Sequence, residues 1–202
     1  MDTPSSDRED AAPASRPRRN RIVLWLVLAL CAAPIIASFV AYYWLRPSGH
    51  VNYGELIPPR AMPAETLKTL DGKTFEWKHI GREWVLVIAD SAKCDERCRE
   101  KLVYTRQVRL AQAKEAERIE RVWLLTDDGT PDAALLAEQP GLRVVRAADS
   151  EALRALPALS TPAAHIYVLD PLGNLMMRFP ERPDPRRMLK DLSRLLRHSK
   201  WK

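Results

Sequence analysis

The longest apolar stretch of the chain lies near its N-terminus. Residues 22–45 read IVLWLVLALCAAPIIASFVAYYWL and contain no charged side chain. As a helix that rises 1.5 Å per residue, this stretch can cross a hydrocarbon core of about 30 Å with some tilt. Trp25 near one end, and Tyr42, Tyr43 and Trp44 at the other, are typical of aromatic residues at a membrane interface. We predict a transmembrane helix that is retained, because the apolar region of a cleaved signal peptide is usually shorter.

The segments on the two sides of this span differ in charge. Four arginines lie just before it, between positions 16 and 21, and only Arg46 lies just after it. Positive charge favours the cytoplasmic side, so we predict a bacterial-type inner-membrane protein with a cytoplasmic N-terminus and a periplasmic C-terminal domain. Residues 1–21 are predicted to be a disordered cytoplasmic tail. Residues 46–63 are rich in proline and are predicted to be an extended tether to a soluble domain at 64–202.

Apolar and polar positions alternate in a regular way through the soluble domain. Residues 83–89 (EWVLVIA) and 121–126 (RVWLLT) are continuous apolar runs that predict strands buried on both faces. Residues 94–119 are charged and free of Pro and Gly, which predicts a helix. Alternation around Asp71-Gly72 predicts a hairpin over residues 67–77. The other predicted elements are a helix at 131–138, a strand at 142–146, a helix at 150–156, strands at 164–169 and 174–179, and an amphipathic helix from 184 onward. This order predicts an α/β fold with a mixed sheet covered by helices on both faces.

The positive charge of the chain is concentrated at its C-terminal end. The 202 residues carry a formal net charge of +6, yet residues 46–183 hold 20 basic and 20 acidic side chains, and residues 184–202 hold seven basic and two acidic ones. A nucleic-acid-binding protein usually spreads a basic face over its fold, so we predict no nucleic-acid partner. The basic segment fits contact with anionic lipid or an acidic partner, or an ordinary solvated helix face.

Cys94 and Cys98 follow the first buried strand and open the helix predicted after it. A spacing of four residues places both sulfurs on one helical face. The helix N-terminus, together with Lys93 and Arg97, favours thiolates over thiols. Two such sulfurs can form a disulfide or bind a soft ion such as Cu(I), and an oxidising compartment allows either use. We predict redox or metal chemistry here; the alternatives are a structural disulfide and two unrelated thiols.

At this point the chain resembles the thioredoxin-fold Sco (SenC) family. The resemblance rests on a strand and loop before a C-x-x-x-C helix start, and on a late strand that is followed by the turn at 170–173 (DPLG) and a final hairpin. It covers residues 64–198. It implies a thioredoxin-like mixed sheet flanked by helices, in a membrane-anchored factor that delivers copper or reduces thiols during cytochrome c oxidase assembly. The implied partners are the membrane and an oxidase subunit or another assembly factor.

The resemblance also implies roles for four residues. In a copper protein, Cys94 and Cys98 would ligate Cu(I), and His165 is the histidine nearest to the position of the family's third ligand, three residues beyond it. In a thiol oxidoreductase, Cys94 would attack as the thiolate and Cys98 would resolve the mixed disulfide. Pro162 precedes a predicted strand and resembles the cis-proline that packs against the cysteines of thioredoxins, so we expect a cis peptide bond. The alternative for His165 is an ordinary strand histidine.

The chain departs from the Sco pattern around its cysteines. It lacks the family's prolines within and after the pair, where Asp95, Glu96, Arg97 and Arg99 stand. This departure motivates a second hypothesis, a non-catalytic interaction module of the oxidase assembly machinery in which Cys94–Cys98 is a structural disulfide. The sequence Asp127-Asp128-Gly129, directly after the second buried strand, predicts a turn and helix cap, with a ligand site as the alternative.

Overall fold

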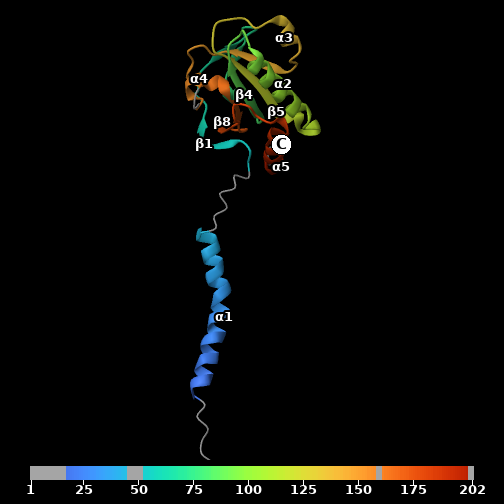
Figure 1. The fold of residues 1–202 in the computed structure, drawn as a ribbon. Helices are drawn as coiled ribbons and strands as arrows, with labels where there is room; N and C mark the ends of the chain where they lie inside the picture. Colours follow the sequence, from blue (N-terminus) through green and yellow to red (C-terminus); the bar gives the residue numbers. More distant parts are fainter. Residues whose placement is uncertain (1–16, 45–51, 158–160, 200–202) are drawn as a thin grey trace, which may run out of the picture. The chain divides into compact units, whose positions relative to one another are not determined.

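The computed structural model describes residues 17–44, 52–157 and 161–199, and the chain divides into two compact units, residues 1–50 and 51–202. The described part of the first unit is one helix, α1 (Pro17–Trp44), drawn in blue in Figure 1. Within it, Arg21–Tyr43 contains an 18-residue stretch with a mean hydropathy of 2.6 and is long and apolar enough to cross a membrane. The residues from 17 to 21, which were predicted to belong to a disordered tail, are helical. The rest of that tail lies outside the described residues.

The second unit is built on one mixed sheet of eight strands in the order β1-β8-β7-β4-β5-β6-β2-β3. At its centre, β4 (Trp84–Asp90) pairs in parallel with β5 (Ile119–Leu125) and antiparallel with β7 (Ile166–Leu169). The other strands are β1 (Glu55–Ala61), β2 (Leu67–Thr69), β3 (Thr74–Phe75), β6 (Leu142–Arg146) and β8 (Asn174–Arg178). The predicted mixed sheet, its two buried strands and the hairpin of β2 and β3 are therefore confirmed (Figure 1).

Helices cover both faces of this sheet. The side chains of β4 point alternately to either side, so the strand contributes apolar residues to a core on each face. Trp84, Leu86 and Ile88 join an apolar cluster that also contains residues of α2 (Glu96–Leu110), α3 (Ala133–Ala137) and α5 (Pro185–His198). Val85, Val87 and Ala89 join a second cluster with residues of α4 (Glu151–Ala155) and the 3₁₀ turn η1 (Trp77–His79). Two more 3₁₀ turns, η2 (Ala113–Arg118) and η3 (Pro162–Ala164), precede β5 and β7 in the chain.

The helix predicted over residues 94–119 is shorter in the structure. α2 ends at Leu110, a 3₁₀ turn follows, and Ile119 already begins β5. The register of the parallel pair places Trp84 beside Ile119, so the chain must return to the start of β4 before β5 begins. A 15-residue helix is about 22 Å long, and a seven-residue strand about 23 Å. The length of β4 therefore limits the length of α2, although the sequence after Leu110 favours helix.

The predicted tether also differs from the structure. Residues 55–61 form β1, an edge strand that pairs antiparallel with β8. The register of this pair shifts between Leu56 and Arg60, and Pro58 and Pro59 lie inside that irregularity. An edge strand with a bulge tolerates proline because the missing N–H groups do not break the ladder. The second unit thus begins before residue 64, and only residues 45–51 separate α1 from its first described residue.

The first described residues of this unit are bound to α5. The buried carboxylate of Asp191 accepts hydrogen bonds from the backbone N–H groups of Tyr53 at 2.7 Å and Gly54 at 2.8 Å. The guanidinium of Arg187 lies 4.1 Å from the centre of the Tyr53 ring, and the guanidinium of Arg194 donates to the side chain of Asn52. The segment that leads into β1 is therefore held along the C-terminal helix.

Candidate functional site

The two cysteines lie at the junction between β4 and α2. Asp95 is the N-cap of α2, and its carboxylate accepts a hydrogen bond of 2.9 Å from the backbone N–H of Cys98, in the first helical turn. Cys94 stands just before the cap, with a positive φ of 42°. An aspartate at the N-cap satisfies one of the helix's free N–H groups, so the sequence itself sets where α2 begins. The predicted helix start is confirmed to within two residues.

Cys94 and Cys98 form a disulfide whose Cα atoms are 5.0 Å apart. Both residues are buried, at 2% and 0% exposed, and belong to the apolar cluster beneath α2. Cys94 is the more exposed of the two only by this small margin. Charged residues of the same loop and helical turn are exposed, namely Lys93, Asp95, Glu96 and Arg97. The disulfide therefore lies just below a charged surface.

The loop that carries Cys94 is held by Asp127, which follows the neighbouring strand β5. The Asp127 carboxylate accepts hydrogen bonds from the Ser91 hydroxyl at 2.5 Å and from the Ala92 N–H at 3.2 Å. It also accepts one from the N–H of Gly129, as expected for a turn. The Ser91 hydrogen bond, with smaller contributions from the backbone N–H groups and Lys93, lowers the pKa of Asp127. The predicted turn is present, and it supports the loop of Cys94.

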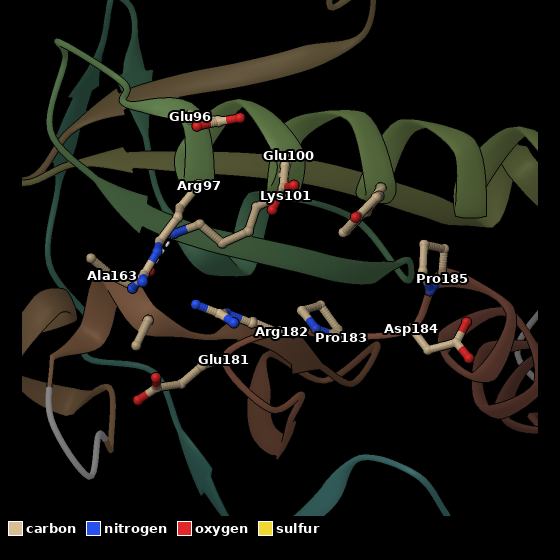
Figure 2. Close-up of a pocket in the computed structure, with 12 residues that line it drawn as sticks. Glu96, Arg97, Glu100, Lys101, Ala163, Glu181, Arg182, Pro183, Asp184 and Pro185 are labelled. Atoms are coloured by element: carbon tan, nitrogen blue, oxygen red, sulfur yellow. Dashed lines mark hydrogen bonds between the residues drawn. The ribbon is translucent and has the colours of Figure 1, made fainter.

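On the other side of the site, one buried ammonium joins three elements. Lys101, one helical turn after Cys98, is 4% exposed, and its Nζ lies 2.7 Å from the carboxylate of Asp90 at the end of β4. The same Nζ donates a hydrogen bond to the carbonyl of Ala163 in η3. Figure 2 shows the Lys101 side chain extending from α2 to Ala163. Lys101 thus fastens α2, β4 and η3 together at a position three residues beyond Cys98.

A cavity of about 620 Å³ lies beside this ammonium, between α2 and the segments before β7 and α5. Glu96, Arg97, Glu100, Lys101 and Tyr104 line it from α2. Ala163, Ala164 and residues 181–185 line it from the opposite side (Figure 2). Its walls carry charges of both signs and reach the first turn of the helix that bears the disulfide. A partner that approaches this cavity would come within one helical turn of Cys98.

Pro162 lies in η3, the turn that Lys101 fastens to α2. The structure has no cis peptide bond among the described residues, so the bond between Thr161 and Pro162 is trans and the expected cis-proline is wrong. Pro162 occupies the first position of a 3₁₀ turn, where its fixed φ suits a helical start. The contact with the cysteine-bearing helix is made by the backbone of the turn, through the carbonyl of Ala163, and not by the proline ring.

His165 is buried at the start of β7, at 4% exposed. Its Nδ1 lies 2.8 Å from the carbonyl of Phe179, so Nδ1 carries the proton, and the buried Nε2 has no hydrogen-bond partner. Its ring contacts Tyr167, two residues along the strand, on the face opposite to Ile166 and the disulfide. In the part of the chain that the structure describes, no three His, Cys, Asp or Glu residues are grouped to hold a metal ion.

Sequence reasoning missed Lys101 and Asp90 as residues of this site. The signal was a lysine at a position that shares the buried face of the helix with Cys98, three residues away. A second signal was an aspartate at the end of a buried strand, which can pair with such a lysine. Neither residue is unusual alone, and the pairing depends on the packing of α2 across β4.

Three comparisons place the chain among known proteins. A family model described as transmembrane-like, thioredoxin-like, C-terminal domain matches residues 84–199. No curated protein sequence matches the chain. Yeast Sco1 with copper bound is 13% identical, covers 71% of this chain and 96% of its own, and has a TM-score of 0.58.

Two bacterial structures are similar to the same extent. Sco1 from Thermus thermophilus is 18% identical, with 73% of this chain and 99% of its own covered and a TM-score of 0.57. ScoI from Bradyrhizobium japonicum with copper bound is 19% identical, with 67% and 99% covered and a TM-score of 0.53. At these identities the similarity shows the fold, and the predicted thioredoxin-like, Sco-like fold is confirmed.

We expect Lys101→Met to destabilise the protein by about 3 kcal/mol, because it leaves the Asp90 carboxylate nearly buried without its partner. Denaturant unfolding of the full chain measures this, with Arg97→Met, an exposed change on the same helix, as the matched control. A double variant, Asp90→Asn with Lys101→Met, should recover part of the loss, since no unpaired charge remains. A Lys101→Met protein as stable as the Arg97→Met control would contradict the role of the pair.

We expect the stabilising effect of Asp127 to depend on pH. Its folded-state pKa lies below the ordinary value of 3.8, so the carboxylate stabilises the fold above that pH, and the contribution is lost as the pH falls through the folded pKa. The free-energy difference between wild type and Asp127→Asn should therefore shrink on acidification from neutral pH to below about pH 4. Unfolding titrations at several pH values measure it, beside the exposed neighbour Asp128→Asn. A difference that stays constant with pH would be evidence against this assignment.

Proposed function

We propose that this chain is a membrane-anchored thiol protein whose Cys94–Cys98 pair alternates between disulfide and dithiol. The chain belongs to the family of transmembrane-like, thioredoxin-like C-terminal domains. The observation that carries the proposal is the disulfide itself, at the end of a central parallel strand and in the first turn of the following helix. Ligand and reaction sites of open α/β sheets lie at the carboxyl ends of such strands. The apolar helix α1 supports the anchor.

The thiol chemistry can be written for the two cysteines as they stand. In the reduced protein, the Cys94 thiolate attacks a sulfur of a partner disulfide, and the other partner sulfur leaves as a thiolate. The Cys98 thiolate then attacks Cys94 Sγ in the mixed disulfide, releases the second partner thiol and regenerates the Cys94–Cys98 disulfide. Two electrons pass to the partner, whose disulfide becomes a dithiol. The helix N-terminus favours the thiolate of Cys98 in its first turn.

Copper enters the proposal as a cargo of the reduced pair. Two thiolates at the start of one helix suit Cu(I), which prefers soft ligands. His165 keeps Nε2 free of hydrogen bonds, as a metal-binding histidine would, and its Nδ1 is held by a backbone carbonyl. Yet its ring lies on the other face of the sheet from the disulfide. We therefore assign Cu(I) binding to Cys94 and Cys98, with His165 outside the ligand set.

The proposed setting is cytochrome c oxidase assembly at a bacterial-type inner membrane, with the soluble unit in the periplasm. The support is the shared fold: a similar structure, 14% identical with a TM-score of 0.53, is described as showing a disulfide switch in a member of the Sco family of cytochrome c oxidase assembly proteins. The arginines before the apolar stretch at residues 22–45 support a cytoplasmic N-terminus. The proposed partners are an oxidase subunit or another assembly factor, and Pro162 is proposed to face them within the turn beside α2.

One observation favours the second candidate, a non-catalytic interaction module with a structural disulfide. Both cysteines are almost fully buried in an apolar cluster, where a disulfide is shielded from attack. The two candidates differ in reduction potential, because structural disulfides resist the glutathione pool and typically lie below about −300 mV.

We expect the pair to equilibrate with glutathione, because a working dithiol must change state within the range of biological redox couples. The full chain with Cys31→Ser is incubated in graded glutathione buffers, and free thiols are counted by alkylation and mass spectrometry. Cys98→Ser should accumulate a mixed disulfide at Cys94, whereas Cys94→Ser should accumulate much less at Cys98. A pair that stays oxidised throughout, with no mixed disulfide in Cys98→Ser, would establish the structural disulfide instead.

We expect the reduced protein to bind one Cu(I) through the two sulfurs. Titration against a competing chelator under anaerobic conditions measures the affinity. Cys94→Ser should lose tight binding, whereas His165→Ala should retain wild-type affinity because its ring points to the other face of the sheet. A large loss in His165→Ala would show that this histidine reaches the metal in the reduced protein. Equal affinities of wild type and Cys94→Ser would rule out copper delivery by this pair.

A further inference from the structure

The C-terminal helix α5 is divided lengthwise into an apolar side and a basic side. Met188, Leu192 and Leu196 are buried against the sheet and α2. At about 100° per residue, all arginines and lysines of α5 fall within about a third of its circumference, on the other side. These residues are Arg186, Arg187, Lys190, Arg194 and Arg197. All of them are exposed except Arg194, which is half-buried.

The acidic residue within α5 and the one that caps it both bind backbone N–H groups. Asp191, the one acidic residue within α5, points inward and is 3% exposed, where it binds the N–H groups of Tyr53 and Gly54. Asp184 caps the helix and accepts a hydrogen bond from the N–H of Arg186. The carboxylates are thus committed to the backbone, and the exposed side of α5 is cationic along its whole length.

This side of α5 also lacks what a protein partner usually needs. The energy of a protein interface is concentrated in buried aromatic and aliphatic anchors. No aromatic or aliphatic side chain of α5, which is described throughout, lies within the basic arc. A regular row of long, exposed cationic side chains suits a diffuse anionic surface such as lipid headgroups.

The path of the chain provides the second argument for lipid. The segment that leads from α1 into the sheet is fastened along α5 through Asp191, Arg187 and Arg194. In the sequence, only residues 45–51 separate α1 from that fastened segment. The first described residues of this unit therefore lie beside the basic helix, and in the sequence they follow α1 closely.

We propose that the basic side of α5 binds anionic lipid headgroups of the membrane in which α1 is anchored. The proposal rests on the membrane anchor of the proposed function and is independent of the chemistry of Cys94 and Cys98. Each Lys or Arg near an anionic surface adds to the attraction, which acts within a Debye length and weakens with salt. The contact would hold the soluble unit in one orientation on its membrane.

The test uses the soluble unit, residues 51–202, without α1. This unit contains the whole sheet and both apolar clusters, so its core is complete without the helix. It is sedimented with vesicles of phosphatidylcholine alone and of phosphatidylcholine mixed with phosphatidylglycerol, at low and high ionic strength. We expect binding only to the phosphatidylglycerol vesicles, and release at high salt.

Two triple variants with the same loss of charge locate the contact. Arg186→Gln, Lys190→Gln and Arg197→Gln together should weaken binding at least about tenfold, because three cations leave the basic side. Lys68→Gln, Lys73→Gln and Lys78→Gln together remove three exposed cations from the region of β2, β3 and η1 and should leave binding unchanged. Circular dichroism checks that both variants are folded, and the salt response of the wild type tests the proposal without any variant.

Three results would overturn the proposal: no binding of the wild type to phosphatidylglycerol vesicles, equal binding to uncharged vesicles, or an equal loss in both triple variants. A wild type that ignores vesicles but binds polyglutamate through Arg186, Lys190 and Arg197 would assign the helix to an acidic protein instead. Cys94→Ser with Cys98→Ser should bind vesicles like the wild type, so failure of the thiol chemistry leaves this result unaffected. Failure of the anchor is seen separately, as release of the full chain from membranes by carbonate.

Discussion

The ammonium of Lys101 is the interaction on which the geometry of the cysteine site depends. A lysine that is 4% exposed cannot remain charged in an apolar layer unless its partners compensate for lost water. Asp90 and the carbonyl of Ala163 provide that compensation, and they come from two different elements. The rotation of α2 about its axis is therefore fixed relative to both β4 and η3. Cys98, three residues before Lys101 on the same buried face, is positioned by the same constraint.

Asp127 provides the complementary constraint from the other side of the disulfide. It stands just beyond the carboxyl end of β5, as Asp90 stands at that of β4, so two neighbouring parallel strands each present one carboxylate at the same edge of the sheet. Asp90 holds the helix that carries Cys98, and Asp127 holds the loop that carries Cys94. The strands are fully paired along their length, which makes their ends a rigid base for both contacts. The disulfide thus spans two separately supported segments.

Those features of the fold that depend on local pattern could be predicted from the sequence. The apolar runs of β4 and β5 are buried on both faces, and Asp71-Gly72 forms the turn of a hairpin, because these properties follow from a few adjacent residues. Features that depend on distant partners could not. The prolines at 58 and 59 argued against a strand, yet β8 offers an edge with room for a bulge. The predicted helix at 94–119 was too long because the length of β4 is a tertiary constraint.

The candidate site shows the same division. The helix start is local and was predicted to within two residues, but Cys94 lies before the N-cap and not on the helical face expected for both sulfurs. The expected cis bond at Pro162 was inferred from a resemblance to thioredoxins and is wrong here. Pro162 instead opens a 3₁₀ turn whose next residue is bound by Lys101. The orientation of His165 is set by strand alternation once β7 begins at Ile166, and that starting point depends on pairing with β4.

The two supports of the disulfide differ in how they can yield, and this difference bears on how a buried disulfide exchanges. The Lys101 contacts are nearly buried, so breaking them would leave two charges that are poorly solvated and unpaired. The contacts of Asp127 with Ser91 and Ala92 lie nearer to solvent, where water can replace each lost hydrogen bond. Opening of the site therefore costs least on the side of Cys94, by movement of residues 91–94 while α2 and its N-cap stay in place. A reagent that reaches the disulfide in this way meets the sulfur of Cys94 first, and this is the order that the proposed exchange requires.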